Sequence, residues 1–143
     1  MFAAFSHNSE LIYNHLMKDE KEWLDQAAFD LKSAEVLLKG GRYTHCVFFC
    51  HLSVEKAIKA AYYQQFKREP PKIHNLNALL KEVNLKPPAN LHNLISELSL
   101  ASVPTRYPEE LRTISKEFNK RTTLRILEQS REVVKWIKEQ LKK

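Results

Sequence analysis

Apolar residues recur every three to four positions along most of the chain, which is the period of an amphipathic α-helix. No stretch alternates apolar and polar residues over the length of a strand. The chain also has only two glycines and six prolines, which leaves little material for hairpins and tight turns. We therefore predict an all-α protein.

The first strong helical pattern begins at Asp19. Leucines and alanines share one stripe, acids occupy the first turn, and Gly40-Gly41 follows the last periodic residue. This predicts a helix of about six turns. Residues 1–17 have weak periodicity and are predicted to be an N-terminal extension, either a short helix or disordered, ahead of one domain over 18–143.

A second helix is predicted from Tyr43 to about Phe66, because the proline pair of KREPPK cannot continue it. Two shorter helices follow, over HNLNALLKEV and over NLHNLISELSLAS. The stretch over 104–122 contains prolines and is predicted as a long ordered loop. Thr122 or Thr123 is then expected to cap a last helix that ends near Leu141.

Small side chains form one stripe along the predicted second helix: Cys46, Cys50, Ser53, Ala57, Ala60 and Ala61. Such a stripe lets a neighbouring helix approach closely, so both thiols are expected in the core. His45 and His51 project about 100° or more away from the cysteines, so the four groups cannot converge on one tetrahedral ion. No metal or redox site is therefore predicted.

The opposite arc of the same helix is too aromatic for a face in water. It holds Phe48, His51, Leu52, Glu55, Lys59, Tyr62, Tyr63 and Phe66. A helix that is apolar nearly all round is buried on both sides, and in so short a chain we expect the second side to meet another copy. Glu55 and Lys59 stand four residues apart with the acid first, so they can pair along the helix or simply set the register of that interface.

Composition narrows the class of protein further. At 143 residues and 43% hydrophobic content, the chain is expected to form a single domain with one core. No uninterrupted apolar run is longer than the five residues of Cys46 to Cys50, which is too short for a membrane span or a secretory signal, so a cytoplasmic protein is expected. No Gly-rich phosphate loop and no Ser/His/Asp set is present.

The net charge of +6 is concentrated near the C-terminal end. Residues 112–143 hold ten Lys or Arg against four Asp or Glu, whereas residues 1–111 are neutral overall. A basic stripe on the last helix is bordered by three acids, which weakens a nucleic-acid interpretation of it. The stripe consists of Arg131, Lys135, Lys138 and Lys142. It indicates either a surface for phosphates or an acidic partner, or a solvated helix face.

Five pieces of sequence follow one another in a recognisable order. They are Trp23 and Ala27 with FDLKSAEVLLKGGRY, then CVFFCHLSVEKAIKAAY, HNLNALL, RYPEE, and a closing helix with VVKWIKEQL. In this order and spacing the chain resembles the HEPN domain family, the nucleotide-binding domain shared by higher eukaryotes and prokaryotes, over roughly residues 19 to 143. The resemblance implies an up-and-down bundle of four or five helices that usually forms a dimer.

Many members of that family are ribonucleases that carry an Arg and a His separated by about four to six residues. The best-matching position here is Arg106, but residues 111–113 are Leu, Arg and Thr, so the usual acid–base group is missing. A literal match, Arg68 and His74, lies in the proline-rich connection after the second helix. The resemblance is therefore to the type without the RNase pair, and an RNA-cleaving toxin of a toxin–antitoxin pair that uses Arg68 and His74 is the alternative.

HEPN proteins that lack this pair and carry an RYP-like loop are commonly encoded beside, or fused to, a minimal nucleotidyltransferase. They look like binding modules for nucleotides or for that partner, without a cofactor. The resemblance assigns such binding to Glu55, Lys56, Lys59, Arg106 and Tyr107, with Asp30, Tyr43 and His51 as second-tier candidates. Arg offers a rigid fork for phosphate, Lys a point charge, and Tyr a ring that stacks on a base.

The same residues can also have purely structural roles. Arg106 can be a structural tie to Glu55, Tyr107 can pack on the bundle, and Asp30 at the edge of its helix can be solvated. We thus expect a non-catalytic homodimer that binds a nucleotide or a nucleotidyltransferase over the second helix and the 104–122 segment. A plain scaffolding dimer that binds no small molecule is a further alternative.

Overall fold

The computed structural model describes residues 19–102, 112–113 and 116–143. Within that part the chain forms helices and no strand. The five helices with defined bounds are α2 (Glu20–Lys39), α3 (Tyr43–Phe66), α4 (Leu76–Val83), α5 (Ala89–Ser102) and α7 (Lys120–Leu141). The predicted all-α fold is confirmed. The expected N-terminal extension over 1–17, and Arg106 and Tyr107, lie outside the described residues.

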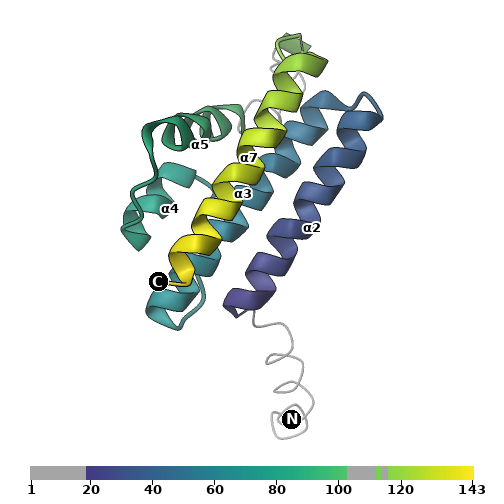
Figure 1. Cartoon of the computed structure of the whole chain (residues 1–143). Helices are drawn as coiled ribbons and strands as arrows, with labels where there is room; N and C mark the ends of the chain where they lie inside the picture. Colours follow the sequence, from purple (N-terminus) through teal and green to yellow (C-terminus); the bar gives the residue numbers. More distant parts are fainter. Residues whose placement is uncertain (1–18, 103–111, 114–115) are drawn as a thin grey trace, which may run out of the picture.

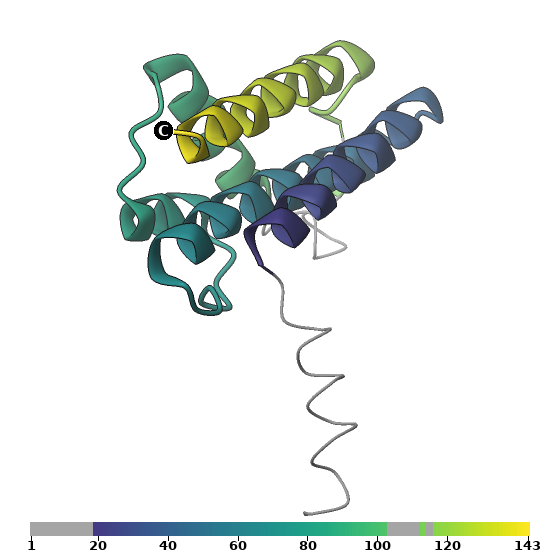
Figure 2. The same cartoon turned by 60° about the horizontal axis from the view of Figure 1, so that its bottom comes forward.

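The three long helices α2, α3 and α7 lie side by side (Figure 1). Of the shorter helices, α5 packs on α3 and α7, and α4 packs on α3 and α5. Viewed from the lower end, α2 lies at one edge of this arrangement and α4 at the opposite edge (Figure 2). α3 is central because it packs against each of the other four helices. None of the helices in the described part is long and apolar enough to cross a membrane.

The ends of α2 and α3 follow the local chemistry of the sequence. The Asp19 carboxylate accepts a hydrogen bond from Glu22 N at 2.9 Å and so caps α2, and Gly41 takes the left-handed backbone, φ 73°, that ends it. α3 begins at Tyr43 and ends at Phe66, as its pattern predicts. Lys67, with φ 52°, then turns the chain toward the proline pair.

The predicted start of the last helix is wrong by a few residues. α7 begins at Lys120, and its cap is Asn119, whose side chain accepts a hydrogen bond from Thr122 N at 2.9 Å. The Thr123 hydroxyl is buried and donates to the Asn119 carbonyl at 2.7 Å. Thr123 is therefore inside the first turn, and 120–122 belongs to the helix instead of the predicted loop.

The helix α3 is buried on more sides than its two sequence stripes indicate. The small stripe is fully or almost fully buried, including both thiols, as predicted. A third strip, Val47, Val54 and Ile58, is 1% exposed or less. In the aromatic arc His51, Glu55, Lys59 and Tyr62 are buried, Phe48, Leu52 and Tyr63 are half-buried, and Phe66 is 37% exposed. The helices α2, α4, α5 and α7 thus cover the small stripe and the third strip, whereas half of the aromatic arc remains partly accessible.

Candidate functional site

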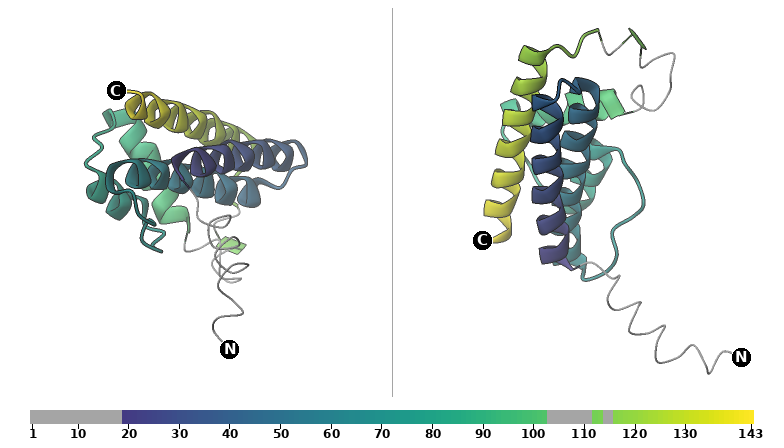
Figure 3. Two further views of the ribbon diagram at one scale, coloured as in Figure 1. Left: turned by 90° about the horizontal axis from the view of Figure 1, so that it is seen from below. Right: turned by 90° about the vertical axis from the view of Figure 1, so that its right-hand side faces the viewer.

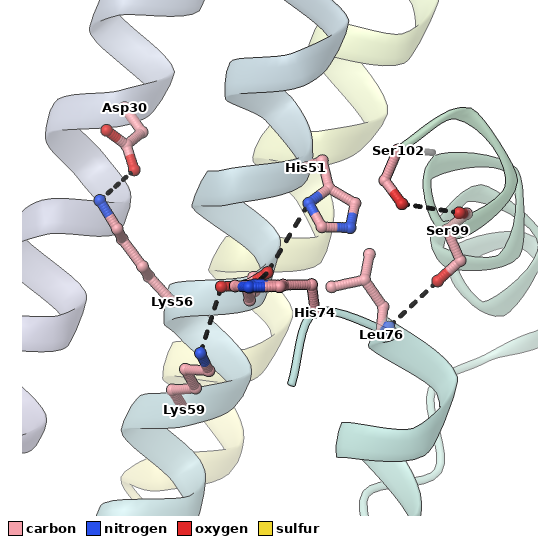
Figure 4. A network of polar contacts seen from close by, with 9 residues as sticks. Asp30, His51, Lys56, Lys59, His74, Leu76, Ser99 and Ser102 are labelled. Atoms are coloured by element: carbon pink, nitrogen blue, oxygen red, sulfur yellow. Dashed lines mark hydrogen bonds and ion pairs between the residues drawn. The ribbon is translucent and has the colours of Figure 1, made fainter. Parts of the chain in front are cut away.

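The middle of α3 carries a buried acid, Glu55, which is only 5% exposed. Its Oε2 accepts a hydrogen bond from Lys59 Nζ at 3.2 Å, one turn along the helix. Its Oε1 lies 3.0 Å from His74 Nδ1 and 3.8 Å from His51 Nδ1. Figure 4 shows His51, Lys59 and His74 turned toward this carboxylate. Three nitrogen-bearing side chains therefore surround one acid largely shielded from water.

The Lys59 ammonium is as well buried as its partner, at 6% exposed. The predicted pairing of Lys59 with Glu55 is present, and Nζ also lies 5.7 Å from the centre of the Trp23 ring. A cation over an indole face is attracted by the ring's electrons, which offsets part of the hydration it has lost. Trp23 comes from α2, so Lys59 links that helix to the Glu55 carboxylate.

A second ion pair lies beside the first and joins α2 to α3. Lys56 Nζ and Asp30 Oδ2 are 2.7 Å apart (Figure 4), and Asp30 is 7% exposed. Asp30 is therefore neither solvated nor at the edge of an open face. One turn away in both helices the Ser53 hydroxyl donates to the Ala27 carbonyl at 2.6 Å. These two contacts fix the register of α2 against α3.

Of the three second-tier residues, two lie near Glu55 in the folded chain and one does not. Asp30 and His51 join the group around α3, and His51 is 1% exposed. Tyr43 is the first residue of α3, twelve positions before Glu55, and packs partly buried against the core. Twelve residues span about 18 Å along a helix, so Tyr43 does not reach this group.

Arg68 and His74, the pair of the RNase alternative, contact α3 at different positions along its axis. The Arg68 side chain donates from Nε to the Tyr62 hydroxyl at 3.2 Å and lies over the Phe66 ring at 5.3 Å. His74 instead faces Glu55. Since Glu55 and Tyr62 are seven residues, about 10 Å, apart along the axis, the two side chains of one chain are directed to separate places.

The charged side chains around Glu55 differ in how far they are exposed to solvent. Glu55, Lys59 and Asp30 are each less than a tenth exposed, whereas the Lys56 side chain is 19% exposed and the His74 side chain 53%. The acids are therefore turned inward, and nitrogen-bearing groups are what the site offers to solvent. Together these five residues form what we call the α3 polar site.

Two residues of this neighbourhood were not assigned to it by the sequence analysis. His74 was considered only for the RNase pair, and Trp23 only as part of the family resemblance. No spacing rule could place them, because His74 lies in the connection before α4 and Trp23 on α2, and both reach Glu55 or Lys59 only through packing. The local signals were the i, i+4 spacings of His51 with Glu55 and of Glu55 with Lys59 on α3.

The basic stripe of α7 lies at the surface, away from α3. Arg131, Lys135 and Lys142 are exposed and Lys138 is half-buried. Arg131 donates to Glu35 Oε2 of α2 at 3.0 Å. The hydrogen bond from Lys39 and the charges of Lys39 and Arg131 hold the pKa of the Glu35 carboxyl below its usual value. Part of this stripe thus serves as a bridge between α7 and α2.

The thiols and histidines of α3 do not form a common site. Cys46 and Cys50 are free and fully buried, while His45 is exposed and His51 is directed to Glu55. The hydrogen bond with Cys46, together with burial, raises the pKa of the Cys50 thiol. In the described ranges no group of three or more His, Cys, Asp or Glu is placed to hold a metal ion.

Both cysteines are expected to resist modification in the folded protein. A thiolate is the reactive form, and burial keeps a thiol-specific reagent such as DTNB from reaching either sulfur. Titration of the native protein should therefore release only a small fraction of the colour that follows addition of guanidinium chloride, which frees both thiols of the chain. Rapid reaction of one thiol in the native protein would contradict the buried position of α3.

Comparisons with known proteins find similarity over most of the helical bundle. The model of the family described as HEPN domain matches residues 20–140. Among solved structures, the crystal structure of TT1696 from Thermus thermophilus is 21% identical, with a TM-score of 0.72 over 86% of this chain and 98% of that one. The structure of ST0689, an archaeal HEPN homologue, is 24% identical, with a TM-score of 0.70 over 87% of this chain and 99% of that one. At these identities the likeness shows the fold. No curated protein matches the chain.

Proposed function

This chain belongs to the HEPN domain family, and from that premise we propose that it is a non-catalytic module that binds a nucleotide, or a nucleotidyltransferase partner, as a homodimer. The observation that carries the proposal is the orientation of the α3 polar site. Its acids are paired and turned inward, and the Lys56 ammonium and the His74 imidazole form its accessible side. Cationic and imidazole donors of this kind suit the phosphate of a nucleotide.

In the proposed complex the phosphate lies against Lys56 and His74. Arg106 and Tyr107, which the family resemblance assigns to the same role, supply a bidentate donor and a ring for the base. Glu55 and Lys59 do not contact the ligand; they hold His74 and the adjoining turn of α3 in place. No covalent chemistry is required, so the module presents or retains a nucleotide for a partner.

The proposal predicts that a nucleotide stabilises the folded protein. A ligand that binds only the folded state adds about 2.7 kcal/mol at about one hundred times its dissociation constant, which amounts to several degrees in melting temperature. The measurement is a thermal-shift titration with ATP, GTP and a short RNA. The shift should be lost in Arg106→Ala and reduced in His74→Ala, and it should be unchanged in Lys81→Ala, a control that removes an exposed cation of α4.

The absence of a nucleotide-dependent shift in melting temperature would contradict the nucleotide proposal. If no nucleotide shifts the wild-type melting temperature at several millimolar, the nucleotide proposal is wrong, and a protein partner or a scaffolding dimer remains. The closed Glu55–Lys59 pair specifically favours the second candidate, a scaffolding dimer without a small ligand. That candidate predicts no shift with any nucleotide in wild type or variants.

The RNase alternative rests on one observation, the hydrogen bond between His74 and the buried Glu55. A carboxylate that orients an imidazole is a common arrangement for acid–base catalysis. The separate placement of Arg68 argues against it within one chain. Incubation of the protein with a labelled RNA decides this point, because cleavage that disappears in His74→Ala would replace the non-catalytic proposal.

A further inference from the structure

A cavity opens beside α4 and α5, on the side of the bundle away from α2 (Figure 3, left). Its volume is about 600 Å³, which lies within the range of about 300–1,000 Å³ typical of small-molecule sites. Its walls come from α4, from the connection between α4 and α5, and from the start of α5. None of the residues of the α3 polar site belongs to its lining. We call it the α4–α5 cavity.

The helix α4 turns one face to the core and an adjoining face to the cavity. Its leucines and Val83 are buried in the core. At about 100° per residue, Asn77, Lys81 and Asn84 fall together on the next arc of the helix, with Leu80 at the shared edge. These four residues line the cavity. The buried leucines therefore fix the orientation of a helix whose neighbouring face presents a lysine and two amides to the cavity.

Hydrogen bonds close one end of the seam between α4 and α5. The Ser99 hydroxyl accepts from Leu76 N at 3.1 Å, and the Ser96 hydroxyl accepts from Asn77 Nδ2 at 3.4 Å. The next position along this row of α5, four residues before Ser96, is His92, which lines the cavity. The seam therefore changes from direct contact to open space within one turn, and the closed part holds the two walls of the cavity at a fixed separation.

The cavity is lined by nitrogen-bearing side chains that have no partner among the described residues. Lys81, Lys86 and His92 are exposed, and no hydrogen bond or ion pair joins them to another described residue. The described lining residues include no Asp or Glu. The acid on the neighbouring part of α5, Glu97, is already paired with Arg125 of α7. The positive charge at the cavity is therefore not compensated by a described acid.

The helix ends next to the cavity account for only one of these side chains. Lys81 lies in the last turn of α4, where the negative end of the helix dipole favours a cation. Lys86 lies in the connection, and His92 lies at the start of α5, whose dipole end is positive. The cavity therefore keeps an excess of positive charge, which attracts an anion.

The rest of the lining indicates the kind of anion. Leu80, Leu85 and Pro87 give the cavity an apolar wall. The described lining includes no Phe, Tyr or Trp, so it offers no aromatic ring of that kind on which a nucleobase could stack. The lining thus combines an apolar wall with cationic groups, as in sites for small amphipathic molecules.

We propose that the α4–α5 cavity binds a small organic anion with an apolar body. The anionic group lies among Lys81, Lys86 and His92, and the apolar body lies against the wall that contains Leu80 and Leu85. This site is separate from the nucleotide site of the proposed function and does not depend on it.

The first experiment is isothermal titration calorimetry of the wild-type protein with 2-naphthoate and with 2-naphthamide, which share their rings and differ in charge. Naphthoate is expected to bind at least about tenfold more tightly, because only the anion gains charge-assisted hydrogen bonds. A parallel titration with 2-naphthyl phosphate shows whether a carboxylate or a phosphate is the preferred group. Equal affinities for naphthoate and naphthamide, or no binding of either anion at several millimolar, overturn the proposal.

The place of binding is tested with variants that remove one charge and keep a side chain of similar polarity. Lys81→Gln and Lys86→Gln are each expected to raise the dissociation constant of naphthoate at least about threefold and to leave that of naphthamide unchanged. Lys135→Gln removes an exposed cation of α7 and is the matched control, expected to change neither. Naphthoate binding that is equally insensitive to all three variants overturns the site.

These results are distinguishable from those of the nucleotide titration. His74→Ala is expected to leave the affinity for naphthoate unchanged. Naphthoate binding without any nucleotide shift keeps the cavity site and overturns the nucleotide site, and a nucleotide shift without naphthoate binding does the opposite. A nucleotide shift that is lost in Lys81→Ala but kept in His74→Ala places the nucleotide in the cavity, which overturns both the ligand class proposed here and the phosphate position at the α3 polar site.

Discussion

Replacement of Glu55 by alanine is expected to lower the free energy of unfolding by about 3–5 kcal/mol. The variant leaves the Lys59 ammonium 6% exposed without its carboxylate, and it removes the partner of His74. A buried charge that has lost its counter-ion must either stay unpaired or give up its proton, and both cost free energy. Urea unfolding of wild type and variant, followed by circular dichroism, measures the change.

The matched control is the ion pair between Glu97 of α5 and Arg125 of α7. It is bidentate, with distances of 2.7 and 3.1 Å, but both side chains are about two-fifths exposed. Glu97→Ala is therefore expected to cost no more than about 1 kcal/mol. Equal losses in the two variants would mean that Glu55 is not shielded from water as the structure shows.

A double variant distinguishes the contribution of the charges to stability from the contribution of side-chain packing. Glu55→Met with Lys59→Met removes both charges and fills a similar volume, so it should be more stable than Glu55→Ala alone. Buried ion pairs replaced by apolar residues are often neutral or even stabilising. A double variant as unstable as the single one would show that His74 and Trp23, rather than the charge pair, carry the local stability.

Replacement of Ile58 by alanine is expected to cost about 2–5 kcal/mol. Ile58 is completely buried and belongs to the third apolar strip of α3, which faces neither the small stripe nor the aromatic arc. Removing three carbons there leaves a cavity that closely packed helices cannot close. Urea unfolding gives the change in free energy, and the slope of the transition shows whether the variant still unfolds in one step.

The same substitution at Ile73 is the control, because that residue is 37% exposed in the connection before α4. Ile73→Ala should lose less than half of what Ile58→Ala loses. If the two variants were equally stable, the third strip of α3 would not face the core. Such a result would contradict the burial of this strip by the other helices of the chain.

Much of the α3 polar site has only a weak sequence signal. Glu55 and Lys59 are paired as their spacing predicts, because both positions lie on one helix whose geometry is known in advance. Asp30 looked like an acid at a helix edge, since an isolated α2 has no way to show that Lys56 will lie 2.7 Å away. His74 lies nineteen residues from Glu55, and only the return of the chain after Phe66 brings them together.

The helices themselves were determined largely by local chemistry. The Asp19 cap, the Gly40-Gly41 stop and the proline pair after α3 act over a few residues, so α2 and α3 have the predicted ends. The start of α7 was missed because Asn119 and Thr123 are both good cap residues. Only the direction of their hydrogen bonds distinguishes the cap from the first turn.

By itself the sequence determined the all-α class, the helix order and the core stripes, because helix period and end signals depend on neighbours a few positions away. The tertiary structure decided which faces remain exposed. It surrounded α3 with four helices of its own chain and left Phe29 and Val36 of α2 in water. The physical reason is that burial is a property of the whole packed chain: an apolar stripe needs a partner, and its own sequence does not say which segment provides it.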